Sequence, residues 1–329
     1  ARIAQLDSDM LAMGESGLPC LCFECMRRFG FVLDPTRPKA LQFIYDTFRR
    51  YTDMGYKYFK LDFLESTLRA KKFADSSVGH GEMLERVVKS VYDAADGRAA
   101  ILACNYPFHS GNRYVGGVRV AADIHSKWES IKHNAISVAA RFWTNNRWWL
   151  NDPDFALCRG FDTSNDPDLL RLKACTVFVP AEGNNADIQR YGNYTLVDVN
   201  RQQLEILLAL VIASAGAINL SDNMPRLNES GLDLARRTVS APLGETAIPL
   251  DLFSSEYPAT WLQHGPGFHR VLLINWNDEP QAMNFCLKRY GIDSTRAVNF
   301  WNDEPVTVKG GWLETVLAPR SCLFAVISE

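Results

Sequence analysis

The sequence predicts an α/β protein of two domains. Residues 1–240 are expected to form a (β/α)8 barrel of the TIM type, incomplete at its N-terminus, and residues 241–329 an antiparallel β-sandwich. In the first part, apolar strands alternate with amphipathic helices, which is typical of a parallel sheet with right-handed crossovers. Polar residues gather at the carboxyl ends of those strands, where barrels of this type carry their active sites. After about residue 240, helical periodicity gives way to short strands divided by turns.

Composition narrows the class of protein. The 329 residues suit roughly two domains, and 47% hydrophobic with 22% charged residues is ordinary for a globular protein. The net charge of −3 and the lack of a basic stripe give no support for a nucleic-acid or membrane partner. Cys20-x-Cys22-x-x-Cys25 has no second cysteine or histidine cluster to complete a zinc site. We therefore expect buried thiols, no metal and no cofactor.

The clearest unit of the barrel part is a helix followed by a strand. The segment 34–38 supplies capping and first-turn residues, and Gly55 is expected to close the helix as a left-handed cap. The apolar face of this helix repeats at helical spacing: Leu41, Ile44, Tyr45 and Phe48. The run 58–62 then predicts a buried strand. Because side chains alternate along a strand, Lys60 and Asp62 should share one face.

The other elements follow in order. Before residue 240 we expect strands at 1–5, 99–103, 118–122, 148–151 and 217–220, helices at 82–95, 128–140 and 201–214, and a loop-rich stretch at 7–31. These make six strand candidates, whereas a closed barrel needs eight. The sequence therefore predicts that the natural N-terminus is missing and that about two strands lie upstream of Ala1.

The C-terminal part is expected to consist of short strands. They are predicted at 270–276, 282–287, 297–301, 312–317 and 322–327. Trp-Asn-Asp-Glu-Pro occurs at 276–280 and again at 301–305. Asn, Asp and Pro favour turns, so we interpret both copies as exits from strands into turns.

Two aspartates at the ends of different strands suggest glycoside hydrolysis. Asp62 and Asp123 could act as nucleophile and as general acid and base in a retaining mechanism. A buried ion pair with Lys60 is the structural alternative for Asp62. For Asp123 the alternative is a structural pair with Arg119.

Five segments carry a resemblance to a known family. The segment 59–64, Phe-Lys-Leu-Asp-Phe-Leu, resembles the nucleophile strand of clan D glycoside hydrolases, the α-galactosidases of families 27 and 36. Segments 104–107, 118–128, 150–154 and 221–223 are similar to the ends of the following strands in that clan. The order and the spacing of all five agree with the family.

The resemblance implies roles for individual residues. Asp62 would be the nucleophile and Asp123 the acid/base, while Lys60 and Arg119 would contact sugar hydroxyls. Asn105 would lie in the pocket that distinguishes sugar substituents, where many family 27 α-galactosidases carry Glu. The other candidate substrate-binding residues are Cys104, Trp128 and Asp152. Core packing is the alternative for Cys104 and Trp128. The paired aspartates that follow the family's first strand have no counterpart in this chain.

The predicted function is therefore a retaining hydrolase. Its expected partner is an oligosaccharide or glycoconjugate with a terminal α-linked galactose-type sugar, and a homo-oligomer is left open. The same residues are compatible with three alternatives: an α-N-acetylgalactosaminidase, a galactosyl transferase of the raffinose-synthase type, and a non-catalytic carbohydrate-binding homologue. The presence of both aspartates argues against the last.

Overall fold

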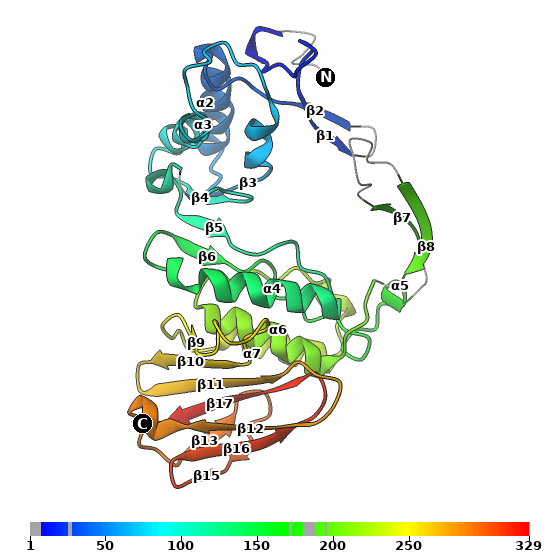
Figure 1. The fold of residues 1–329 in the computed structure, drawn as a ribbon, viewed down its shortest axis with the longest axis vertical. Coiled ribbons are helices and arrows are strands. Elements are labelled where there is room, and N and C mark those ends of the chain that lie inside the picture. Colours follow the sequence, from blue (N-terminus) through cyan, green and yellow to red (C-terminus); the bar gives the residue numbers. More distant parts are fainter. Residues whose placement is uncertain are drawn as a thin grey trace. The chain divides into compact units, whose positions relative to one another are not determined.

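The computed structural model describes residues 8–25, 28–108, 110–170, 173–179, 188–194 and 196–328 (Figure 1). The backbone divides into two compact units. The first unit comprises Ala1–Arg119 with Asn146–Leu150, and the second comprises Val120–Asn145 with Asn151–Glu329. The expected strand at 1–5 lies outside the described residues. A domain boundary near residue 240 stays a prediction.

A parallel sheet is the centre of the α/β part. Its four strands, β3 (Tyr58–Leu61), β4 (Ala100–Ala103), β5 (Gly117–Arg119) and β6 (Leu150–Asp152), lie in the order β3-β4-β5-β6. The β3–β4 and β4–β5 pairs are parallel. The expected class, α/β with a parallel sheet, is confirmed at this level. Closure into an eight-stranded barrel is not established by the four strands that the described residues contain.

Helices α2 (Pro38–Asp53) and α3 (His80–Ala95) share one core with this sheet. The core packs Phe59 and Leu61 of β3 against Ile44 of α2 and Leu84 and Val88 of α3. Pro38 is the first residue of α2 and Gly55 follows it at φ = 95°, both as expected. Asp34 does not cap α2, contrary to expectation.

Asp34 instead organises the loop that precedes α2. It is buried, and its Oδ1 accepts hydrogen bonds from the Thr36 N–H (2.9 Å) and hydroxyl (2.6 Å). Its Oδ2 accepts from the Ala74 N–H at 2.7 Å. The carboxylate therefore ties two loops together, which is a task that short polar side chains perform outside helices.

The loop-rich interpretation of residues 7–31 holds for residues 11–20 but overlooks two strands. After η1 (Ser8–Met10), strands β1 (Leu21–Cys25) and β2 (Arg28–Phe31) pair in an antiparallel hairpin. The sequence hides this hairpin because no Gly, Asn, Asp or Pro occurs between residues 21 and 29 to mark a turn.

The described residues of the second unit contain three long helices. α4 (Trp128–Arg141) and α6 (Arg201–Ser214) confirm their predictions, whereas α7 (Glu229–Ser240) was not expected. Asn200 caps α6 in a reciprocal capping box with Gln203. The expected strand at 217–220 is wrong, since only Leu220 forms a parallel bridge, to Ala156. The short elements are α5 (Pro167–Leu170), β7 (Lys173–Val179), β8 (Ile188–Tyr194), η2 (Leu64–Arg69), η3 (Asn112–Tyr114), η4 (Phe142–Thr144), η5 (Met224–Arg226) and η6 (Leu287–Tyr290).

The C-terminal part forms two antiparallel sheets, as expected. One has the strand order β14-β13-β17-β11-β10-β9 and the other β12-β16-β15. The strands are β9 (Ile248–Pro249), β10 (Thr260–Gly265), β11 (Phe268–Asn275), β12 (Gln281–Cys286), β13 (Ala297–Asn299), β14 (Pro305–Val306), β15 (Val308–Lys309), β16 (Trp312–Leu317) and β17 (Ser321–Ser328). All five predicted strands are present. Both Trp-Asn-Asp-Glu-Pro segments leave a strand for a turn, after β11 and after β13.

A single apolar core joins α6 to the larger of these sheets. Trp261, Leu272 and Phe324 of the sheet belong to the same buried cluster as Leu208 and Val211 of α6. Among the helices that the structure describes, none is both long and apolar enough to span a lipid bilayer.

Candidate active site

Asp62 stands directly after the last residue of β3. Along β3, Phe59 and Leu61 are buried while Lys60 is exposed, and Asp62 continues on the exposed face. This confirms that Lys60 and Asp62 share a face. Asp62 Oδ1 accepts a hydrogen bond of 2.8 Å from the Phe63 N–H. Phe63 has a φ of 55°, and this left-handed conformation turns the chain into η2.

The strand register places further candidates in one row with Asp62. Leu61 pairs with Ala103 and Ala103 pairs with Val118, so the residues one step onward are Asp62, Cys104 and Arg119. The Cys104 N–H donates to the Leu61 carbonyl at 2.8 Å, which extends the ladder to this row. Neighbouring strands lie about 4.8 Å apart, so the Asp62 and Arg119 backbones are roughly 10 Å apart. Laterally paired residues point to the same face of a sheet, so this face carries both a carboxylate and a guanidinium.

Cys104 and Asn105 differ in exposure although they are neighbours. Cys104 is fully buried, at 0% exposure, which fits its packing alternative. Asn105 is exposed and has a φ of 50°. The chain therefore turns through a left-handed residue directly after β4, as it does at Phe63 after β3.

Left-handed residues recur at these strand ends. Phe63 and Asn105 follow β3 and β4, and Asp154, with φ = 72°, follows β6. Such conformations cost free energy in residues other than glycine and concentrate at functional sites. Asp96 and Ala215 are also left-handed, but they end helices, where this conformation is routine.

Asp123 lies in the loop that leads to α4. β5 ends at Arg119, so the expected strand at 118–122 is too long, and Asp123 sits four residues beyond the strand. Both neighbours of Asp123 are anchored. The Ala122 carbonyl accepts a hydrogen bond from Asn134 Nδ2 at 3.0 Å, and the Ile124 N–H donates to Asp154 Oδ2 at 2.7 Å. Asp123 itself is exposed.

Asp152 and Asp154 are buried behind this loop, at 1% and 2% exposure. Asp152 Oδ1 accepts from the Asp154 N–H at 3.0 Å, and the Asp152 carbonyl accepts from the Val120 N–H at 2.8 Å. Asp152 thus orients Asp154, which in turn holds Ile124. Asp154 was not predicted as a site residue, although an Asp two residues after an Asp can signal such a side-chain-to-backbone turn.

Trp128 is the first residue of α4, and its side chain is 5% exposed. Its ring packs against Trp276 at a centroid distance of 5.6 Å, and the Arg320 guanidinium lies 5.4 Å from its ring centre. The structure therefore places Trp128 in the core, which is the alternative that the sequence left open. Its contact with a sugar stays a prediction without added support.

Asp222, from the last of the five resembling segments, has a structural role as well. Its side chain is 0% exposed, accepts from Arg159 Nη1 at 2.8 Å and accepts from the Cys158 N–H at 2.7 Å. Burial, and then the charge of Asp222, raise the pKa of Cys158 to about 12, so this thiol stays protonated. Within the described ranges, no group of three or more His, Cys, Asp or Glu side chains could hold a metal ion.

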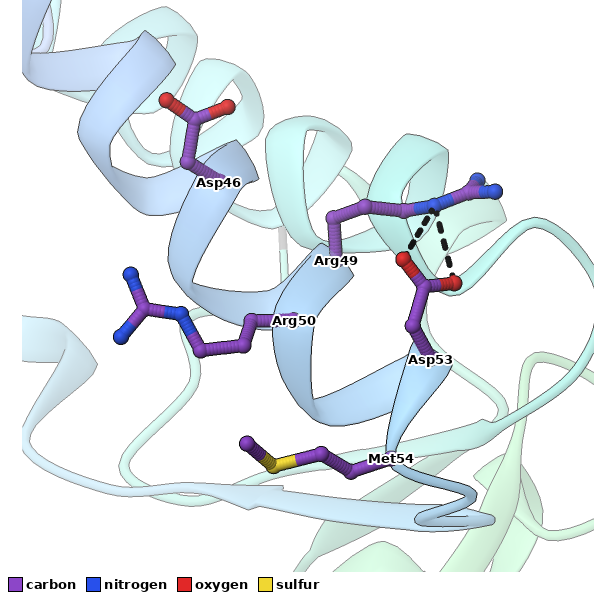
Figure 2. A pocket seen from close by; sticks show the side chains of 5 residues that line it. All are labelled: Asp46, Arg49, Arg50, Asp53 and Met54. Carbon is purple, nitrogen blue, oxygen red and sulfur yellow. Dashed lines mark hydrogen bonds and ion pairs between the residues drawn. The ribbon is translucent and has the colours of Figure 1, made fainter.

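The cavity on α2 is distinct from these strand ends. It measures about 460 Å³ and is lined by Asp46, Arg49, Arg50, Asp53 and Met54 (Figure 2). Two of its charged groups form an ion pair, since Arg49 contacts Asp53 at 3.3 Å, and Arg98 also contacts Asp53 at 2.8 Å. The C-terminal end of a helix that precedes a parallel strand lies near the amino end of that strand. This cavity is therefore at the opposite edge of the sheet from Asp62.

The candidate residues divide between the two units. Lys60, Asp62, Cys104, Asn105 and Arg119 belong to the first, where the sheet brings them to one edge. The second carries the remaining three, Asp123, Trp128 and Asp152, with Asp123 on an anchored loop.

Comparison with known proteins gives the fold. No family model matches the sequence. The structure is similar to a β-L-arabinopyranosidase of glycoside hydrolase family 27 from Geobacillus stearothermophilus, with a TM-score of 0.67 and 13% identity, over 97% of this chain and 67% of that one.

Two α-galactosidases are similar as well. For α-galactosidase I from Mortierella vinacea the TM-score is 0.59 at 11% identity, covering 91% of this chain and 72% of that one. For an α-galactosidase from Thermus thermophilus, solved with stachyose, the TM-score is 0.54 at 17% identity, covering 73% and 46%. The chain therefore has the α-galactosidase-like fold of family 27 glycoside hydrolases.

Proposed function

We propose that this chain carries the active site of a retaining glycoside hydrolase that cleaves terminal α-galactosides. The observation that supports this most is Asp62, held at the carboxyl edge of the parallel sheet beside a strained residue. The similarity in fold to family 27 enzymes supports the same class of chemistry. In this proposal the parallel sheet is part of a (β/α)8 barrel and the C-terminal sheets pack as a separate domain.

Asp62 acts as the nucleophile. Its Oδ1 is occupied by the Phe63 N–H, and the described residues offer Asp62 no other hydrogen bond or ion pair. The second oxygen is therefore available to attack the anomeric carbon and form the glycosyl-enzyme bond. The bond to Phe63 orients the carboxylate before substrate arrives, which lowers the entropic part of the barrier.

Asp123 acts as the acid and then as the base. It protonates the leaving oxygen as the glycosidic bond breaks, and later takes a proton from the water that releases the sugar. Both neighbours of Asp123 are hydrogen-bonded, which fixes the backbone of the loop while the carboxylate stays exposed. Such a support is what a positioned acid requires.

Lys60, Arg119 and Asn105 bind the sugar. Lys60 lies on the same face as Asp62, Arg119 lies in the same row, and Asn105 is exposed after β4. All three offer N–H donors, which suit the oxygen atoms of a sugar hydroxyl. Cys104, Trp128 and Asp152 are buried, which suits packing better than direct contact with the sugar.

A panel of aryl glycosides tests the substrate class. We expect the full-length protein to hydrolyse the aryl α-galactoside with retention at the anomeric carbon, as followed by proton NMR. The aryl α-N-acetylgalactosaminide tests the alternative that depends on Asn105. The aryl β-L-arabinopyranoside belongs in the panel because its ring has the configuration of an α-galactoside without the hydroxymethyl group. Hydrolysis of none of the three, or inversion, would refute the proposal, whereas transfer to an added galactoside would favour the transferase.

A further inference from the structure

The C-terminal sheets carry a cavity that the proposed mechanism does not use. It measures about 430 Å³, within the range of about 300–1,000 Å³ that is usual for small-molecule sites. Its lining comes from both sheets, namely the start of β10, the end of β12 and the start of β16, together with η6. All of these elements belong to the second unit.

Three aromatic side chains line this cavity, namely Phe285, Tyr290 and Trp312. Tyr290 stacks on Phe285 with ring centres 5.0 Å apart and an angle of 12° between the planes. Phe285 is itself buried, so it supports the Tyr290 ring from below. Trp312 is 44% exposed and pairs with Cys286 across β12 and β16, which keeps both side chains on the outer face of that sheet. The cavity therefore presents flat apolar surface at a low cost in side-chain entropy.

Polar side chains surround these rings, and two of them are available to a ligand. The exposed side chains of Arg289 and Asn284 have no hydrogen bond or ion pair to another group of the described chain. Asp251 provides acceptors, and its position is fixed because it accepts from the backbone N–H groups of Ala259 at 2.8 Å and Thr260 at 3.2 Å. The lining carries one positive charge, on Arg289, and one negative charge, on Asp251, so its formal net charge is zero.

We propose that this cavity binds a neutral saccharide residue. A pyranose ring has an apolar C–H face, which suits the Trp312 ring, and a rim of hydroxyls that both donate and accept. Arg289 and Asn284 would donate to those hydroxyls, and Asp251 would accept from one of them. An anionic ligand would meet the Asp251 carboxylate, and a purely apolar ligand would leave the donors unpaired. This site needs neither Asp62 nor Asp123, so it holds independently of the proposed hydrolase.

Native electrophoresis in gels that contain a soluble polysaccharide tests this site. The probes are galactomannan and dextran, and every protein carries Asp62→Asn so that the gel is not digested. We expect the parent protein to be retarded in at least one gel, and Trp312→Ala and Arg289→Ala to lower the apparent affinity by about three- to tenfold. Val316→Ala is the matched control, since Val316 is 71% exposed on the same face of the same strand and does not line the cavity.

The outcomes separate this site from the active site. If only the active site bound the polysaccharide, the three variants Trp312→Ala, Arg289→Ala and Val316→Ala would be retarded equally. That result would overturn the proposal. The absence of retardation in both gels would overturn it as well. In the background with Asp62 intact, Trp312→Ala should leave kcat/KM for an aryl galactoside unchanged. A protein without hydrolase activity that still showed the loss of affinity in Trp312→Ala would refute the hydrolase and keep the saccharide site.

Discussion

At the scale of single residues, the orientation of Asp62 depends on Phe63. An aromatic residue with φ = 55° is strained, and a strain of this kind costs on the order of 1–3 kcal/mol. In return, the Phe63 N–H points back at the Asp62 carboxylate, and the chain leaves the edge of the sheet within one residue. Strand alternation in the sequence predicted that Asp62 lies on the same face as Lys60. It could not predict Phe63, because side-chain type does not reveal a left-handed backbone in an aromatic residue.

Asp123 is tested by the leaving group. We expect Asp123→Ala to retain much more activity on aryl galactosides with acidic phenols than on natural oligosaccharides, because a good leaving group needs little protonation. The measurement is kcat/KM across a series of leaving groups, with added azide to replace the base. Asp46→Asn is a control, since Asp46 is an exposed carboxylate on α2. An equal loss on every substrate would show that Asp123 is structural.

At the scale of elements, the loop before α4 is held by a carboxylate from the segment after β6. Asp154 accepts from Ile124 at 2.7 Å and is 2% exposed, so its removal leaves a buried N–H unsatisfied. Such a loss typically costs about 1–3 kcal/mol. Because Ile124 is next to Asp123, the same change should also displace the proposed acid.

We therefore expect Asp154→Ala to lower both the free energy of unfolding and kcat, and Asp154→Asn to recover part of each. The amide oxygen of Asn can still accept from the Ile124 N–H, whereas Ala offers no acceptor. Urea denaturation and steady-state kinetics on the same preparations provide the two readouts. If Asp154→Ala lost stability while kcat stayed at the level of the parent, the loop would not depend on this bond for its position.

Arg237 of helix α7 contacts the C-terminal sheet region through a carbonyl and a carboxylate, and the contact with the carboxylate depends on pH. Arg237 donates to the Phe300 carbonyl at 2.8 Å and to Asp303 Oδ2 at 2.8 Å. The hydrogen bond from Arg237, and then its charge, lower the pKa of Asp303. For Asp233, burial raises the pKa, but hydrogen bonds from Arg201 and Arg237 outweigh it and the net shift is downward. Stability from a carboxylate with a lowered pKa is present above its ordinary pKa and is lost as the pH falls through the folded value.

We expect Arg237→Gln to lower Tm at neutral pH and to differ less from the parent as the pH falls below about 4, where both carboxylates become protonated. Salt should reduce the difference, since Asp303 is exposed. Arg236→Gln is the control on the same helix, because the Arg236 side chain is 66% exposed and its ion pair with Glu229 is long, at 3.5 Å. A Tm difference that did not change between pH 7 and pH 3 would assign the effect of Arg237 to its bond with Phe300.

An element could be predicted from the sequence where large apolar residues mark its buried face, and was missed where small or polar residues are buried instead. Helix α6 has a capping box and a long apolar run, so its bounds were found. Helix α7 was missed because the residues that it buries are mostly small or polar, Gly231, Ala235 and Thr238 beside Leu234, so few large apolar side chains mark its buried face. Strand β10 was missed because a buried polar residue, Gln263, interrupts its apolar pattern.

At the scale of the whole chain, buried polar side chains join the helices of the second unit to its sheets. Gln263 is 1% exposed, and its Nε2 donates to the Glu245 carbonyl at 2.7 Å and to the Ile212 carbonyl at 3.3 Å. Its Oε1 accepts from Arg270 Nη1 at 2.7 Å. Burial lowers the pKa of Arg270 to about 10, and the Phe268 ring lies 4.4 Å from its guanidinium. These bonds link β10, β11 and the end of α6.

We expect Gln263→Ala to lower the free energy of unfolding by about 2–4 kcal/mol, because it removes buried volume and deprives Arg270 Nη1 and the Glu245 carbonyl of their partner. Chemical denaturation measures this loss. Gln281→Ala, at a half-buried position at the start of β12, should have little effect. A similar stability for both variants would show that the link between α6 and the sheet is made by apolar packing alone.

The proposed mechanism depends most on Asp62 being the nucleophile. The direct measurement is mass spectrometry of the full-length protein after reaction with an activated 5-fluoro-galactosyl fluoride, which forms the glycosyl-enzyme but slows its breakdown. We predict one added fluorogalactosyl group on the peptide that contains Asp62, and none in Asp62→Asn. A label on another carboxylate, or an active enzyme that takes up no label and gives product of inverted configuration, would contradict it.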